Sequence, residues 1–213
     1  MDKLSDIENH LHALALDRPL FHSEADFQHA LAWHLQRTLI DVNIRLEKPF
    51  RHNPRGSKYL DLMLMIEGSA IAIELKYKTK KIKHRHNGEE FDIQNHGAQD
   101  IGRYDFLADV ARLEEFVSVI DNCDRGYAIL LTNEPSYWAL SSRPGTVDER
   151  FRLHEGREIS GTLGWLDHAS AGTTRGRENP ITLDGKYNAT WRDFSSISSE
   201  PGGQFRFLAW QID

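Results

Sequence analysis

Apolar side chains recur every three or four residues in two segments near the start of the chain. The first segment, residues 3–16, carries the stripe Leu4, Ile7, Leu11 and Leu14 and is followed by Pro19. The second begins at Ser23, where SEAD has the form of a capping box, and continues with Phe27, Leu31, Leu35 and Leu39. This spacing puts apolar side chains on one helix face, and proline stops a helix. The pattern predicts two amphipathic helices.

The pattern then changes to short apolar runs. Residues 42–50 (VNIRLEKPF) alternate enough for a strand, and residues 52–57 (HNPRGS) have the composition of a loop. Residues 59–77 (YLDLMLMIEGSAIAIELKY) contain two apolar runs on either side of Gly68-Ser69. Because a two-residue connection between such runs is a hairpin signal, we expect Gly68-Ser69 to be the turn.

A second helical pattern and a further strand follow. Residues 98–120 carry apolar side chains at helical spacing, namely Ile101, Tyr104, Leu107, Val110, Leu113 and Val117. Residues 126–133 (GYAILLTN) form a short apolar run, which is typical of a buried strand. Between the hairpin and the long helix, the polar residues 87–95 are interpreted as a loop.

The signal is weaker after Pro135. Short strands are expected at 148–153, 159–166 and 186–194. Residues 205–212 (FRFLAWQI) are expected to form a closing strand. The segment 170–179 (SAGTTRGREN) is interpreted as a loop, with contact to a phosphate backbone as the alternative. No linker forces two domains. We therefore expect a single α/β domain over residues 1–213, with a core at about 23–133 and a mostly β extension at about 134–213.

Composition places the chain among globular proteins. Hydrophobic residues make up 39% and charged residues 27%, and no apolar run approaches the roughly 18 residues of a membrane-spanning helix. The first residues mix acids, bases and histidines, unlike a secretory signal. The single cysteine, Cys123, excludes an intramolecular disulfide and a Cys-based zinc site. We therefore expect a cytoplasmic protein without a membrane partner.

Charge is unevenly distributed. The formal net charge of -6 argues against attraction of nucleic acid to the whole surface. The stretch from Lys76 to Arg85, however, contains six basic residues and no acidic one: Lys76, Lys78, Lys80, Lys81, Lys83 and Arg85. Such a run can face phosphates on an otherwise acidic protein. An ordinary solvated loop is the alternative interpretation.

The hairpin brings charged residues together. With Glu67 opposite Ala70, Asp61 lies opposite Lys76. Because side chains alternate along a strand, Asp61, Glu74 and Lys76 then share one face, with the two carboxylates diagonal neighbours roughly 7–8 Å apart at the backbone. Two carboxylates at that distance can share a divalent metal ion. An ordinary exposed face with an ion pair across the hairpin is the alternative.

Asp61 followed by Glu74-Leu75-Lys76 resembles the motif of the PD-(D/E)xK, or restriction-endonuclease-like, nuclease superfamily. That motif is an acid on one strand of a hairpin and acid-x-Lys on the next; here Leu60 stands in place of the proline. The predicted order of helix, three strands, helix and strand over residues 23–133 is similar to the superfamily core. The resemblance implies a restriction-endonuclease-like fold and divalent-metal-dependent hydrolysis of DNA.

The resemblance also assigns roles. It implies that Asp61 and Glu74 bind Mg²⁺, for which Mn²⁺ can substitute, and that Lys76 assists the attacking water. Glu24, in the first turn of the second helix, matches a Glu that several branches of the superfamily direct at the metal. A carboxylate favoured by the helix N-terminus is the alternative. Phosphodiester hydrolysis needs a nucleophile formed near neutral pH and neutralisation of charge in the transition state, which this set can supply.

DNA is the expected partner. Candidate phosphate contacts are Lys78, Lys80, Lys81, Lys83, Arg85, Gln99 and Arg103. Gln99 and Arg103 lie one turn apart on the long helix, where a plain polar helix face is the alternative. A homodimer is compatible with double-strand cleavage, and nothing identifies other protein partners. Two other functions stay open: a catalytically silent member that binds nucleic acid or protein, and a structural α/β protein, which the net charge favours.

Overall fold

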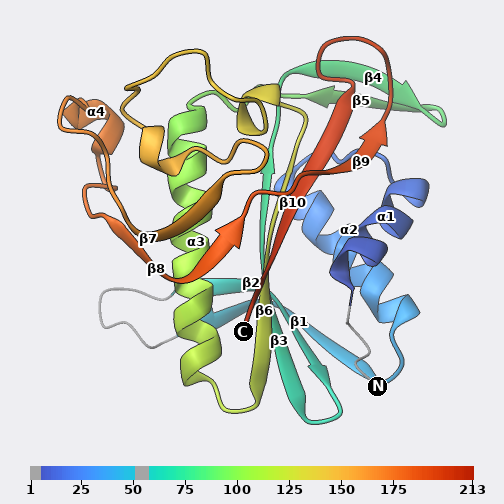
Figure 1. Cartoon of the computed structure of the whole chain (residues 1–213). Coiled ribbons are helices and arrows are strands. Elements are labelled where there is room, and N and C mark those ends of the chain that lie inside the picture. Colours follow the sequence, from blue (N-terminus) through green and yellow to red (C-terminus); the bar gives the residue numbers. More distant parts are fainter. Residues whose placement is uncertain (1–5, 51–57) are drawn as a thin grey trace.

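A six-stranded mixed sheet forms the centre of the computed structural model, which describes residues 6–50 and 58–213 (Figure 1). The strand order is β1-β2-β3-β6-β10-β9, with β3 and β6 parallel and the other neighbours antiparallel. These strands are β1 (Val42–Phe50), β2 (Lys58–Ile66), β3 (Ser69–Lys78), β6 (Cys123–Thr132), β9 (Arg192–Ser196) and β10 (Gln204–Ile212). The last two come from the C-terminal segment, so this segment completes the sheet rather than forming an appendage.

Helices cover the two faces of this sheet (Figure 1). The pair α1 (Ile7–Asp17) and α2 (Glu24–Thr38) packs on one face, and α3 (Gln99–Val119) packs on the other. Strand β3 shows the division, because Ile73 and Leu75 join the core under α1 and α2, whereas Ala72 joins the core under α3. Side chains along one strand therefore alternate between two apolar cores.

The helix predictions are confirmed with small shifts. Helix α1 begins at Ile7, later than expected, because the Asp6 side chain accepts the Asn9 amide and caps it. Helix α2 begins after Ser23, whose hydroxyl accepts the Asp26 amide at 3.1 Å. Within the described residues no helix has the length and apolar character needed to cross a lipid bilayer.

The predicted hairpin exists, but its turn is Glu67-Gly68 rather than Gly68-Ser69. Both turn residues have positive φ (52° and 90°), as a type I′ turn requires, and Ile66 pairs with Ser69. The predicted pairing of Asp61 with Lys76 is therefore wrong. Continuing the observed register beyond Leu62↔Ile73 puts Asp61 opposite Glu74 instead. Since this is a shift of two residues, every side chain keeps its predicted face.

The loop predicted at 87–95 is also wrong, because this region forms a second hairpin. It joins β4 (Ile82–His86) to β5 (Glu89–Ile93), outside the central sheet. Asn87 and Gly88 make the turn with φ values of 48° and 85°. Asn-Gly is a strong hairpin signal, and Phe91 is buried beneath the hairpin. The basic run is thus split between β3 and β4.

The C-terminal segment departs most from the sequence prediction. The strand expected at 148–153 is wrong: a short 3₁₀ turn, η2 (Glu149–Phe151), lies there after η1 (Pro135–Tyr137). The strand expected at 186–194 is instead the end of one strand and the start of another. The remaining elements are β7 (Glu158–Leu163), α4 (Ala171–Thr174) and β8 (Ile181–Asn188). The expected loop 52–57 lies outside the described residues.

Candidate active site

The candidate site lies where β2 separates from β3. Backbone pairing between them extends to Leu62↔Ile73, while β3 continues to Lys78. Carboxylates accept two β3 amides beyond that point: the Leu75 amide donates to Asp61 Oδ2 (2.6 Å) and the Tyr77 amide donates to Glu24 Oε2 (2.7 Å). Since buried amides need partners, these two carboxylates are held in place by the backbone of β3.

A buried glutamine of α2 fixes the position of Asp61 from the other side. Gln28 lies one turn after Glu24 and is 7% exposed. Its Nε2 donates to the main-chain oxygen of Asp61 and to Glu47 Oε1, both at 2.8 Å. The side chain therefore joins α2, β1 and β2 at the base of the site.

The side chains of Glu74 and Lys76 point to α3, where they enter a chain of ion pairs. Arg112 contacts both oxygens of Glu74, with NH2–Oε2 at 2.6 Å and Nε–Oε1 at 3.1 Å. Its NH1 lies 2.7 Å from Asp109 Oδ1, and Asp109 Oδ2 lies 2.5 Å from Lys76 Nζ. Each of the two β3 residues is thus paired with a residue of α3.

Burial shifts the protonation equilibria of this site. It raises the pKa of Asp61 to about 6, although the Leu75 amide and the Lys76 charge act in the opposite direction. Burial also raises the pKa of Glu74, despite its contact with Arg112. For Lys76, burial would lower the pKa, but the surrounding carboxylates, led by Asp109, outweigh burial and raise it. Lys76 is therefore protonated near neutral pH.

Negative charge is in excess at the base of the site. Two cations, Lys76 and Arg112, face four carboxylates that interact with them: Glu24, Asp61, Glu74 and Asp109. Among these six groups the carboxylates exceed the cations by two formal charges, and burial reduces this excess because it favours the protonated forms of Asp61 and Glu74. Lys78 adds a positive charge at the edge of the cleft.

An open cleft of about 510 Å³ is lined by Glu24, Lys76, Asp109 and Arg112, whereas Asp61 and Glu74 are not among its lining residues. The C-terminal segment contributes Gly176 and Arg177 to the cleft wall. Arg177 forms a two-point ion pair with Asp105 of α3, with N–O distances of 2.6 and 2.9 Å. The segment 170–179 is therefore part of the site wall, with α4 within it, and not merely a connecting loop.

The other candidate phosphate contacts are dispersed. Lys81, Lys83 and Arg85 are exposed on and beside β4, and Lys80 is half-buried, with its amide bonded to Asn133. Gln99 is the first residue of α3.

Arg103 is buried, with NH1 2.7 Å from Asp148 Oδ2 and NH2 donating to the Ser136 carbonyl at 2.6 Å. Its guanidinium is thus part of the protein interior and is not accessible to a phosphate.

Sequence reasoning missed Gln28, Asp109 and Arg112. Asp109 and Arg112 are three residues apart, so they share a helix side next to the apolar stripe of α3. Gln28 follows Glu24 by one turn and therefore lies on the same side of α2. In both helices, charged or amide side chains beside the apolar stripe were the sequence feature that could have indicated these site residues.

The site's ability to hold a metal ion depends on which carboxylate oxygens are free. Among the described residues, no group of three or more His, Cys, Asp or Glu is arranged to hold one. Glu74 has both oxygens on Arg112, whereas Asp61 and Glu24 each bond a β3 amide through one oxygen. Mg²⁺ commonly uses one or two protein carboxylates and keeps several waters. Asp61 and Glu24 each keep one carboxylate oxygen that makes no hydrogen bond to the described residues.

No protein-family model matches the chain, and no curated protein shows significant sequence similarity to it. The functional argument therefore depends on the chemistry of the cleft. That chemistry is a cluster of four carboxylates, two buried and two half-buried, with Lys76 and Arg112 between them, at the open end of a hairpin.

Proposed function

We propose that the protein is a divalent-metal-dependent nuclease that hydrolyses phosphodiester bonds of DNA. The observation that carries this proposal is the convergence of Glu24 and Asp61, from two separate elements, on the amides that flank Lys76. A strand with carboxylates at its splayed edge and a lysine between them is the arrangement expected of a PD-(D/E)xK site. The order α2, β1, β2, β3, α3, β6, interrupted only by the separate β4-β5 hairpin, also supports a restriction-endonuclease-like core.

In this proposal Asp61 and Glu24 hold Mg²⁺, and the Leu75 and Tyr77 amides orient the two carboxylates. When bound, the ion would lower the pKa of a coordinated water and neutralise charge on the scissile phosphate. Lys76 carries three donor hydrogens, and Asp109 engages its ammonium from one side. The remaining hydrogens can orient the attacking water or stabilise negative charge as it develops.

Basic residues outside the cleft floor supply contacts to the DNA backbone in this proposal. Lys78 lines the cleft, and Lys81, Lys83 and Arg85 present exposed charges on the neighbouring hairpin. Contacts of this kind position the phosphate backbone but do not read base sequence. Attraction is then local to the cleft side, in a protein whose net charge is -6.

The ion pairs favour a second candidate function, a catalytically silent protein that binds nucleic acid. Arg112 engages both oxygens of Glu74, and Asp109 engages Lys76, so two residues of the motif have internal partners. In an active enzyme, Glu74 would be a third metal ligand beside Asp61 and Glu24 only if Arg112 released its carboxylate. A silent protein would keep these pairs closed when metal is added.

Incubation with supercoiled plasmid and Mg²⁺ or Mn²⁺ tests the proposal. The wild type and the control Glu115→Gln, an exposed acid on α3, should convert plasmid to nicked or linear forms. Asp61→Asn should not. Full cleavage by Asp61→Asn would refute the proposed site. Plasmid binding without cleavage by the wild type would favour the silent protein.

A further inference from the structure

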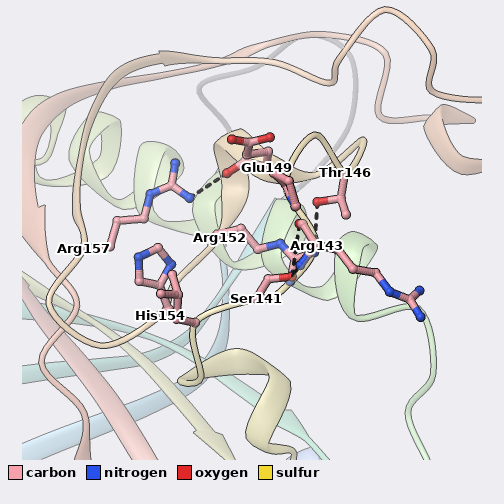
Figure 2. A pocket seen from close by; sticks show the side chains of 9 residues that line it. Ser141, Arg143, Thr146, Glu149, Arg152, His154 and Arg157 are labelled. Carbon is pink, nitrogen blue, oxygen red and sulfur yellow. Dashed lines mark hydrogen bonds between the residues drawn. The ribbon is translucent and has the colours of Figure 1, made fainter.

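A second charged pocket lies among residues 140–157 and has a volume of about 310 Å³ (Figure 2). Its lining includes Arg143, Arg152, Arg157 and His154 but only one acid, Glu149. The side chains of Arg152, Arg157 and His154 gather in Figure 2, whereas the guanidinium of Arg143 extends away from them. The pocket therefore has an excess of positive charge, opposite in sign to the cleft floor.

Hydrogen bonds to neutral groups hold one of these arginines in place. Arg157 NH1 donates to the Glu149 carbonyl at 2.6 Å, as the dashed line in Figure 2 shows, and NH2 donates to the Arg150 carbonyl at 3.0 Å. The Glu149 carboxylate instead accepts the Gly145 amide at 2.6 Å. Carbonyl oxygens fix the guanidinium of Arg157 but do not neutralise its charge.

Arg152 and His154 have donors available. Arg152 NH2 donates to Thr146 Oγ1 at 3.0 Å and lies 3.1 Å from Asp148 Oδ1. Arg152 Nε is buried and has no hydrogen-bond partner among the described residues. Burial, with the charges of Arg157 and Arg152, lowers the pKa of His154, as expected beside surplus positive charge.

Asp148 compensates Arg152 only in part, because it is shared. Its other oxygen, Oδ2, pairs with Arg103 NH1 of α3 at 2.7 Å. Next to Arg103, Tyr104 lines the metal cleft, and its ring packs on Phe151 with centroids 5.3 Å apart. A thin layer of side chains thus separates the basic pocket from the cleft.

From this geometry we propose that Arg152, His154 and Arg157 form a binding site for a phosphate group of the nucleic acid, separate from the cleft. The identity of the ligand as nucleic acid rests on the proposed function, whereas phosphate binding itself does not. Guanidinium groups bind phosphate through paired, charge-assisted hydrogen bonds, and Arg152 and Arg157 bring two of them to the lining of one pocket. The phosphate is either a terminal phosphate or a backbone phosphate displaced from the scissile bond.

The test uses the intact protein in EDTA, so that neither cleavage nor cleft metal contributes. Inorganic phosphate is titrated against chloride at equal ionic strength while the His154 ring protons are followed by NMR. We expect a saturable shift with phosphate in the wild type and in Asp61→Asn. Absence of a phosphate-specific shift at His154 would overturn the proposal, without requiring a pocket variant that folds.

Fluorescence anisotropy with single-stranded oligonucleotides identifies the source of the phosphate. Arg152→Gln should weaken binding about tenfold, the usual effect of losing one charge-assisted hydrogen bond, and Arg150→Gln, an exposed arginine nearby, less than twofold. A 5′-phosphorylated strand that binds tighter than its 5′-hydroxyl form supports a terminal phosphate. Equal binding of the two forms, with the same loss in Arg152→Gln, supports a backbone phosphate.

Equal affinity of wild type and folded Arg152→Gln for both strands would overturn the assignment to nucleic acid. If the proposed nuclease function is wrong, the experiments would give a different result. In that case Asp61→Asn and the wild type would be alike in plasmid cleavage, while phosphate binding at His154 would be unaffected.

Discussion

Two arginines of α3 form ion pairs with carboxylates from distant parts of the chain, yet the regions around them differ in sign. Arg112 pairs with Glu74 beneath the cleft, where four carboxylates face two cations. Arg103 pairs with Asp148, and the side chains of both are almost fully buried, at 3% and 4% exposure. On the far side of Asp148, the pocket lining has three arginines and one acid.

The difference shows that a buried Arg–carboxylate pair is weak evidence of a site, because such a pair is locally neutral. The unbalanced charge next to the pair is what indicates a binding site. A surplus of carboxylates calls for a cation, and a surplus of arginines calls for an anion. In our proposals, a metal ion binds in the first region and a phosphate group of the nucleic acid binds in the second.

The largest effect is expected from breaking the interior pair. Arg103→Met leaves buried Asp148 with Arg152 as its remaining charged partner, and loss of one member of a buried pair typically costs about 3–5 kcal/mol. Urea denaturation should show this loss of unfolding free energy, and added Mg²⁺ should not restore it.

Arg112→Met is the matched variant. It leaves Glu74, which is 3% exposed, without its cationic partner, so it should also reduce stability, and added Mg²⁺ should recover part of that loss. If both variants lost the same unfolding free energy and neither responded to Mg²⁺, the proposed difference between the two regions would be wrong.

Lys76→Ala should separate catalysis from metal binding. The carboxylates hold the metal in our proposal, so removing a nearby positive charge should leave Mn²⁺ affinity in calorimetry unchanged or slightly higher. Plasmid cleavage should fall about 10²–10³-fold, the usual effect of losing one transition-state donor. Glu74→Gln should reduce both properties. Full cleavage by Lys76→Ala would rule out the mechanism.

The raised pKa of Asp61 predicts a stability that depends on pH. Its pKa is about 6 in the folded protein against an ordinary 3.8, so folding favours the protonated acid. In metal-free buffer, the contribution of Asp61 to the unfolding free energy should be greatest below about pH 4 and should fall by about 1–3 kcal/mol as pH rises through 6.

Asp61→Asn tests this dependence, because it cannot titrate and should lack that decline. It should therefore exceed the wild type in stability at pH 7.5. Mg²⁺ should stabilise the wild type and not the variant. Thermal melts at pH 4 and pH 7.5 that decline equally in both proteins would contradict the assignment.

The smallest effect is expected at the exposed hairpin. Replacing Lys81, Lys83 and Arg85 with Gln should weaken DNA binding equally for all sequences and reduce its salt dependence by roughly one logarithmic unit for each lost contact. Metal affinity should not change. Unaltered affinity and salt slope, measured by anisotropy over a range of NaCl, would show that the run is an ordinary solvated surface.

Local pattern was sufficient for the elements whose signal lies within a few residues. The periodicity of α2 and α3, the apolar run of β6 and the closing strand β10 were predicted because one face or both faces of each must be apolar to pack. The proximity of Asp61, Glu74 and Lys76 was predicted from the hairpin and is retained despite the wrong turn, since the error was two residues.

The ion-pair partners of the two α3 arginines could not be predicted in this way. Arg103 was predicted as a phosphate contact because Gln99 lies one turn before it, and Arg112, on the same helix, was overlooked. Their partners, Asp148 and Glu74, are 45 and 38 residues distant along the chain. Which carboxylate reaches which arginine depends on how the C-terminal segment and β3 pack against α3, and packing between distant segments leaves no local signature in the sequence.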